Sequence, residues 1–248
     1  MIENAQLISL SRQTSLARQM DVVANNVANI NTTGFKAESL LFEDYIMPVA
    51  DYSAAATPSD ELLHYTDDWA TVHNFRPGSI QQTGNALDVA LQGPGFFVVQ
   101  TQAGERYTRD GSFKIDNSGL LVDDQGNAVL SEGGEIRFTD SETDIHFNAD
   151  GSIVSSAGNK GTLRIAEFED PRALIHKGDN LYSSDQPPLT ASQTSLVQGA
   201  LERSNVSGVS EIATMIRVQR AYEAITNLLD RQNQLRETAI RDLASLNG

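Results

Sequence analysis

The chain has 248 residues, a formal net charge of −15 and no cysteine, so it can form one sizeable core or two small ones but no disulfide or thiolate zinc site. Residues 1–40 and 201–248 each hold equal numbers of basic and acidic residues, and the whole negative excess lies between them. Because an acidic surface repels nucleic acid and anionic lipid, both are poor partners for this chain.

The first predicted element is a long amphipathic helix within residues 1–34. Its apolar residues follow the 3-4-3 spacing of a coiled-coil seam: Met20, Val23, Val27 and Ile30, with Leu16 four residues earlier. Thr32-Thr33-Gly34 supplies helix breakers, so we expect the helix to end near Asn31, with Gly34 in the left-handed conformation. Phe35 is then most simply an aromatic anchor behind the helix stop.

Residues 35–75 are predicted to form an extended linker with short local structure, because they combine Pro48, Pro58 and Ala54-Ala55-Ala56 with several Ser and Asp residues. Residues 76–203 have the pattern of a β-rich middle domain. Phe96-Phe97-Val98-Val99 is a compact apolar strand. Turn signals recur at short spacing: Asp110-Gly111, Ser118-Gly119, Gln125-Gly126, Gly133-Gly134 and Asp150-Gly151. This rhythm predicts an antiparallel meander closed into a barrel or sandwich.

A second long helix is predicted within residues 204–248. Ser204, Asn205 and Ser207 can each cap its N-terminus. From Ala221 onward, a 4-3 spacing carries a seam of Ile225, Leu228, Gln232, Leu235 and Ala239. Polar Gln232 at a seam position favours a larger bundle over a simple dimer.

The expected fold is α+β, with the N- and C-terminal helices pairing as a coiled coil around a central antiparallel all-β domain. Two matched helices at the ends of one chain favour a subunit that polymerises through a bundle of its own termini. Both helical ends are electrically neutral, so copies of them can pack together without accumulating like charge.

Candidate subunit contacts lie on both helices. Asn25, Asn26 and Asn29 are unfavourable in a helix if their side chains have no hydrogen-bond partners. A buried Asn amide can, however, fix the register between packed helices. Arg220 and Tyr222 lie within one turn, and such residues are frequent hot spots when desolvated between subunits. The predicted subunit interface comprises Met20, Val23, Asn25, Asn26, Val27, Asn29, Ile30, Gly34, Phe35, Ser204, Asn205, Val206, Ile216, Arg220, Tyr222, Ile225 and Leu228.

No catalytic, cofactor-binding or metal-binding residues are predicted. Gly93-Pro94-Gly95 lacks the third glycine of a dinucleotide loop. The sequence around Asp123 lacks the later Glu of a calcium loop. His64, His73, His146 and His176 are scattered without metal-ligand spacing. No Ser lies in a nucleophile elbow, and the abundant carboxylates single out no acid and base.

Several blocks resemble, in order along the chain, the signatures of the flagellar axial rod and hook proteins. They are Ala24–Lys36, Thr83–Leu91, Gly93–Phe97, Tyr107–Phe113, Gly119–Val122, Leu201–Val206 and Met215–Ala224. Residues 37–75 and about 140–195 carry no such signature. The length and the single compact middle most resemble the proximal-rod branch of this family. The distal-rod branch is the close alternative, and a hook protein should carry a much larger middle.

The resemblance implies a structural subunit of the bacterial flagellar basal body rather than an enzyme. It implies helical assembly with other rod proteins, passage through the flagellar type III export apparatus and a place in the periplasmic rod. The N-terminus lacks the basic and apolar regions of a Sec signal peptide, and no segment has the roughly 18 apolar residues of a membrane span. Export without a cleaved signal peptide and no membrane insertion are therefore expected. From the residues alone, a secreted β-rich binding module dimerised by its helices, or a hydrolase with paired carboxylates, remains open.

Overall fold

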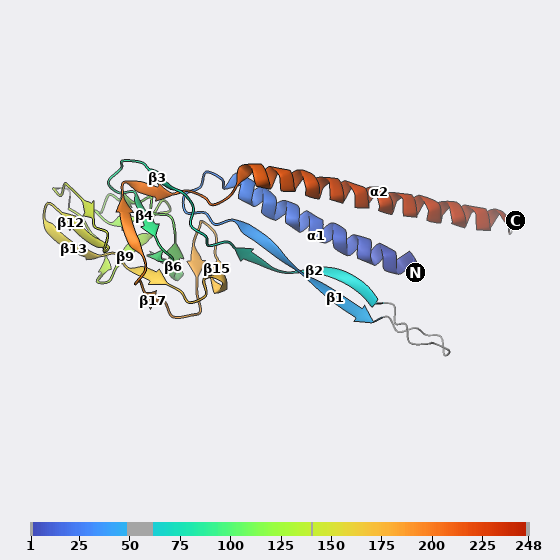
Figure 1. Cartoon of the computed structure of the whole chain (residues 1–248), viewed down its shortest axis with the longest axis horizontal. Helices are drawn as coiled ribbons and strands as arrows, with labels where there is room; N and C mark the ends of the chain where they lie inside the picture. The colour runs from blue at the N-terminus through green and yellow to red at the C-terminus, as the bar shows by residue number, and fades with distance from the viewer. Residues whose placement is uncertain (1, 49–61, 140, 247–248) are drawn as a thin grey trace. The chain divides into compact units, whose positions relative to one another are not determined.

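The computed structural model describes residues 2–48, 62–139 and 141–246 (Figure 1). These residues form two compact units. The helical unit contains Met1–Val27, Glu38–Val72 and Gly208–Gly248, and the β-rich unit contains Ala28–Ala37 and His73–Ser207. The chain therefore passes between the units at residues 27/28, 37/38, 72/73 and 207/208.

The helical unit is built from α1 (Ile2–Ala28), α2 (Gly208–Leu246) and the paired strands β1 (Glu38–Pro48) and β2 (Leu62–His73). The helices run antiparallel. Near the end of α1, Asn26 Nδ2 donates to Glu211 Oε2 at the start of α2, and in the middle of α1, Gln13 Nε2 donates to Thr226 Oγ1 further along α2. Among the described helices, none is long and apolar enough to cross a membrane.

Both terminal helices appear where the sequence predicts them. α1 ends at Ala28, slightly before the expected Asn31, and a turn follows in which the Thr32 amide donates to the Asn29 carbonyl. Gly34 has φ +66°, the left-handed conformation that the sequence predicts there. α2 begins at Gly208, just after the candidate capping residues.

Residues 35–75, for which the sequence indicates an extended linker, contain β1 and β2. Both strands are rich in the aromatic and β-branched residues that favour extended structure, such as Tyr45 in β1 and Trp69 in β2. Pro48 lies at the end of β1, where a proline is compatible with a strand. Pro58 and Ala54-Ala55-Ala56 lie outside the described residues.

The β-rich unit is made of short strands, and every recorded pairing among them is antiparallel. The strands are β3 (Ile80–Gln82), β4 (Val89–Gln92), β5 (Phe96–Thr101), β6 (Gly104–Thr108), β7 (Lys114–Ile115), β8 (Leu121–Val122), β9 (Ala128–Ser131), β10 (Gly134–Glu135), β11 (His146–Phe147), β12 (Ser152–Ser155), β13 (Gly158–Thr162), β14 (Ile165–Glu167), β15 (Ile175–His176), β16 (Tyr182–Ser183), β17 (Leu189–Thr190), β18 (Ser195–Gln198) and β19 (Ala200–Glu202), with a 3-10 turn η1 (Pro171–Ala173). The α+β class is thus confirmed.

The largest sheet has the order β15-β16-β6-β5-β9-β8-β7, with β10 on β9, and β14 joining β5 to β17. Three smaller sheets accompany it: β11-β12-β13, β18-β4 and β19-β3. Among the described strands the main path is open, with β15 and β7 at its ends, so the pairings do not close a single barrel.

Strand β5 separates two apolar cores. Phe97 and Val99 point into one core with residues such as Phe113 and Ile153, whereas Phe96 and Val98 belong to the other. Successive side chains of a strand point to opposite faces, so a strand that is buried on both faces needs an uninterrupted apolar run. This explains the run Phe96-Phe97-Val98-Val99 that the sequence marks as a strand.

Candidate functional site

The segment before β1 is fixed in the β-rich unit through Gly34. Its amide donates to the Glu202 carbonyl at 2.8 Å. A Cβ at this position would lie 2.5 Å from the Arg109 carbonyl carbon and the Asp110 amide nitrogen, closer than side chains approach backbone. Next to it, Thr33 Oγ1 donates to Asp110 Oδ1 at 2.8 Å. Glycine at position 34 therefore permits both the left-handed turn and the close approach.

Lys36, Arg109 and Glu202 form a buried ionic cluster in the same unit. Lys36 Nζ lies 2.6 Å from Glu202 Oε1, and Arg109 Nη1 lies 3.5 Å from Glu202 Oε2. All three side chains are 0–1% exposed. The Gly78 amide also donates to Glu202 Oε1, at 2.7 Å. One carboxylate thus joins three chain segments that are far apart in sequence.

One further donor of each cation is directed at a backbone carbonyl, whereas Arg109 Nε is buried without a hydrogen-bond partner among the described residues. Lys36 Nζ donates to the Arg76 carbonyl at 3.1 Å, and Arg109 Nη2 donates to the Gly93 carbonyl at 2.7 Å. The Arg109 guanidinium also stacks over the Phe96 ring, 4.9 Å from its centroid. Burial lowers the pKa of Lys36 and of Arg109, and the charge of Glu202 opposes this shift in both. The cluster is arranged to hold the fold rather than to transfer a proton.

Asn205 connects three neighbouring stretches of chain in the β-rich unit. Its Oδ1 accepts from the Ala37 amide at 2.8 Å. Its Nδ2 donates to the carbonyls of Asn74 and Arg76, at 2.6 and 2.9 Å. All of these partners are backbone groups, so a single side-chain amide holds the ends of three segments in register.

In the helical unit, Asn26 has a comparable role. It is the buried member of the three asparagines, and its amide forms two hydrogen bonds of 2.8 Å with the backbone N–H and C=O of Glu38 at the start of β1. It also reaches Glu211 Oε2 on α2, at 3.4 Å. Asn25 is exposed and Asn29 half-buried. Asn26 thus ties the end of α1 to β1 and to α2 within one subunit, and the interface role expected of the three asparagines stays a prediction.

The outer surface of α2 carries large apolar side chains. Val209 is 85% exposed and Leu235 is 71% exposed, and Ile212, Ile216 and Leu228 are about half exposed. The covered residues of α2 are different ones, since Val218 is buried and Tyr222, Ile225 and Leu229 are half-buried. Of the seam expected from the sequence, Ile225 and Gln232 are therefore covered, and Leu228 and Leu235 are not.

Comparisons with known proteins match the same parts of the chain. The model described as flagella basal body rod protein matches residues 7–36, the flagellar hook protein FlgE/F/G D1 domain matches residues 90–155, and the flagellar basal body rod FlgEFG protein C-terminal matches residues 197–242. The flagellar basal-body rod protein FlgF of Caulobacter vibrioides is 36% identical and covers 99% of this chain and 100% of its own length. The chain belongs to the flagellar basal-body rod protein family.

Within the rod family, the chain is FlgF-like. FlgF of Mesorhizobium japonicum is 31% identical over 98% of this chain and 99% of its own length. FlgG of Borreliella burgdorferi, the alternative, is 36% identical but covers 86% of this chain and 88% of its own length. The relatives are structural rod proteins, so the chain is a structural subunit of the flagellar basal-body rod and not an enzyme. This sets aside the hydrolase and the binding module.

A hollow of about 330 Å³ lies beside β14 and β17 in this rod protein. Glu132, Arg164 and Pro188 line it together with residues of the two strands, and no aromatic side chain contributes to its lining. The hollow therefore lacks the aromatic surface that the binding-module alternative requires.

The other predicted contact residues fall into two groups. Val23 and Phe35 are buried within their units, and Met20, Val27, Ile30, Ser204 and Val206 are half-buried. Ile216, Arg220 and Leu228 lie exposed on α2, where another subunit can reach them. The interface assignment of all these residues stays a prediction.

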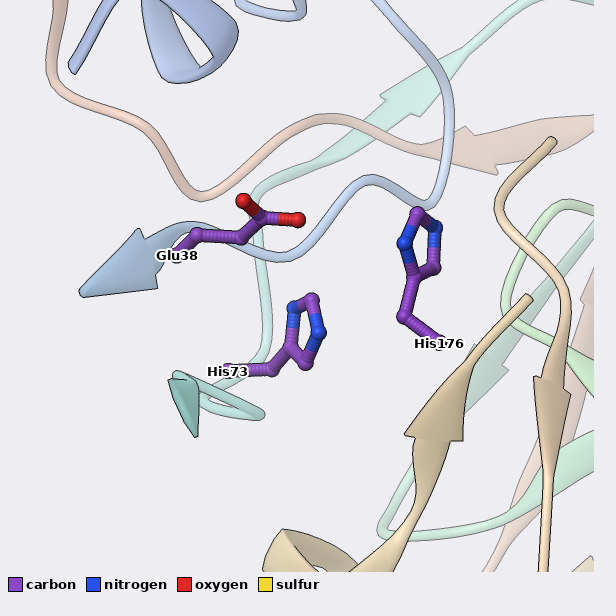
Figure 2. A group of neighbouring side chains, drawn as sticks. All are labelled: Glu38, His73 and His176. Atoms are coloured by element: carbon purple, nitrogen blue, oxygen red, sulfur yellow. The ribbon is translucent and has the colours of Figure 1, made fainter. Parts of the chain in front are cut away.

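His73 and His176 approach each other although the sequence gives no sign of it. The two side chains lie near each other (Figure 2), with ring centroids 5.2 Å apart. Both rings also pack on Tyr182. Burial lowers the pKa of His73 to about 4, and the neighbouring His176 adds to this shift. Glu38, which Figure 2 also labels, belongs to the helical unit. Two imidazoles among aromatic rings form a packed cluster rather than a complete set of metal ligands.

The main residues that sequence reasoning missed are Lys36, Arg109 and Glu202. Each lies inside a block that resembles the rod family, but nothing in the spacing of these blocks pairs their charges. The available signal was the presence of charged residues in Gly-Phe-Lys, Tyr-Thr-Arg-Asp-Gly and Leu-Glu-Arg-Ser-Asn, in the first two beside a glycine and an aromatic residue.

Proposed function

We propose that this rod protein is a proximal-rod subunit that polymerises through α1 and α2, which pair as a coiled coil. In this proposal residues 1–34 and 204–248 are the assembly helices, residues 35–75 connect them to the body, and residues 76–203 form the β-rich body. A 4-3 alternation of covered residues on α2 supports the coiled coil: Glu211, Met215, Val218, Tyr222, Ile225, Leu229 and Gln232.

The observation that carries this proposal is the outer face of α2. Its exposed large apolar side chains recur over most of the helix, from Val209 to Leu235. A helix that is apolar on more than one side is normally buried by further elements. The subunits of a rod supply such elements.

The partners in this proposal are other flagellar rod proteins in a helical assembly, because a full-length relative carries the name FlgF and a relative over most of the chain carries the name FlgG. Delivery through the flagellar type III export apparatus, without a cleaved signal peptide, is also part of it. The rod then lies in the periplasm.

A triple substitution on α2 tests the assembly role. In Ile216→Gln/Leu228→Gln/Leu235→Gln, exposed apolar groups become polar while helix propensity hardly changes. We expect the variant to fold and to be exported in native amounts, but not to enter basal bodies or restore motility in cells that lack the native chain.

The matched control changes three exposed apolar residues of the β-rich unit, Ile115→Gln/Val154→Gln/Leu189→Gln. This variant should assemble normally. Incorporation of the α2 variant at the native level would show that the outer face of α2 is not an assembly surface.

A further inference from the structure

We propose that α2 docks side by side, in parallel, with α2 of a second copy of this chain, with the basic flank of one helix against the acidic flank of the next. This inference rests on the proposed assembly function and names the geometry and the partner of the same surface. It is carried by the distribution of charge around the exposed side of α2.

The acidic flank consists of Glu223, Asp230 and Glu237, which are seven residues apart and all exposed. A seven-residue spacing keeps side chains on one side of a helix over many turns. The described contacts of this flank are local ones on the same helix: Gln219 Nε2 donates to Glu223 Oε1 at 3.3 Å, and Arg241 lies 3.9 Å from Glu237. Both members of the Arg241–Glu237 pair are solvent-exposed, so they can exchange partners at little cost.

The basic flank lies on the other side of the exposed face. It carries Arg217, Arg220 and Arg231, all exposed, together with the exposed Leu228 and Leu235. At about 100° per residue, the two flanks are separated by about 100° around the helix axis, and each is turned away from the covered residues of α2. The helix therefore presents opposite charges to two different lateral neighbours.

The charge distribution selects the type of contact. An antiparallel two-fold pair centred between the two flanks would place basic flank against basic flank and acidic flank against acidic flank. Parallel copies displaced sideways instead place unlike flanks together, and this heterologous contact can be repeated from subunit to subunit. Leu228 and Leu235 on the basic flank supply apolar area to bury at each contact, and the charges fix orientation and register.

Two reciprocal variants of the full chain test this contact. One reverses the acidic flank, Glu223→Lys/Asp230→Lys/Glu237→Lys, and the other reverses the basic flank, Arg217→Glu/Arg220→Glu/Arg231→Glu. Each variant alone presents like charges on both flanks, so we expect its self-association, measured by sedimentation velocity over a range of concentrations, to weaken at least about tenfold.

The decisive arm is an equimolar mixture of the two variants. Copies with two basic flanks can then alternate with copies with two acidic flanks, so association should return to near the native level. Association of the native chain should also weaken with added salt, because the flank charges are exposed. Circular dichroism should show native helix content for both variants, since all six positions are exposed helix surface.

The control reverses three exposed charges of the β-rich unit, Glu132→Lys/Glu169→Lys/Asp185→Lys, which gives the same change in net charge as the acidic-flank variant. It should associate like the native chain. Native-like association of either flank variant, absence of rescue in the mixture, or a native chain that stays monomeric throughout would each overturn docking to a second copy. If the flank variants enter rods normally while the glutamine variant of α2 does not, the assembly role stands and only this geometry is wrong.

Discussion

Lys36 Nζ donates a 2.6 Å hydrogen bond to Glu202 Oε1 across 166 positions of the sequence. Neither side chain is more than 1% exposed. The pair joins the segment that follows α1 to the last strand before α2, inside the β-rich unit. Because a buried charge without its partner is costly, the pair is a sensitive point of the fold.

Glu202→Gln should lower the free energy of unfolding by about 3–5 kcal/mol, because it leaves the cations of Lys36 and Arg109 buried without their carboxylate. Urea denaturation measures the change. The control is Glu105→Gln: Glu105 forms a two-point ion pair with Arg164, at 2.7 and 2.9 Å, with both side chains more than one-third exposed. That substitution should cost about 0–1 kcal/mol. Equal losses for the two variants would refute the importance of burial here.

Gly34→Ala should be much more harmful than Gly84→Ala. Both glycines have positive φ, +66° and +76°, so both substitutions carry a conformational cost of about 1–2 kcal/mol. At Gly84 a Cβ meets no atom within 4 Å, whereas at Gly34 it lies 2.5 Å from backbone atoms. The difference in unfolding free energy between the two variants isolates the close approach, and a difference near zero would contradict it.

Asn26→Ala should destabilise the junction of α1 with β1 by about 1–3 kcal/mol, because the backbone N–H and C=O of Glu38 both lose their partner. A local measurement is amide hydrogen exchange, in which the Glu38 N–H should become much less protected. Asn227→Ala, on the exposed side of α2, is the control and should leave this exchange unchanged. Retained protection of Glu38 in the Asn26 variant would rule out the bond.

The stability of the chain should fall in mild acid because of His73. Its pKa is lowered by burial from 6.5 to about 4, so the unfolded state binds the proton more readily than the folded state. The contribution of the neutral imidazole is complete above about pH 6.5 and is lost as the pH falls towards 4. Urea denaturation at several pH values should show a smaller loss over this range for His73→Gln than for the native chain.

The exposed His146 provides the control for this pH dependence. His146→Gln should follow the native curve between pH 6.5 and 4. If the His73 variant follows it too, the titration of His73 does not govern stability in this range.

The elements that depend on local pattern could be predicted from the sequence. Apolar spacing located both helices, and the run Phe96–Val99 and the recurrent glycine turns located the β-rich unit. The buried cluster could not be predicted, because the pairing of Lys36 with Glu202 depends on how distant segments meet and leaves no periodic signal. Periodicity also predicted Leu228 as a seam residue of α2, whereas Leu229 is the more covered of the two. A seven-residue repeat does not match the helix period, so a seam predicted from spacing alone can be wrong by one residue.

The hydrogen bonds of Asn205 have a mechanical consequence. Three of the four places where the chain passes between its units, 37/38, 72/73 and 207/208, adjoin Ala37, Asn74 and Asn205, which this one amide ties together. A pulling force on any one of these three segments is therefore shared with the other two through Asn205. The three segments should resist that force together and not separate one at a time. In a rod subunit, force can then pass through three short segments of the chain at once instead of through a single one.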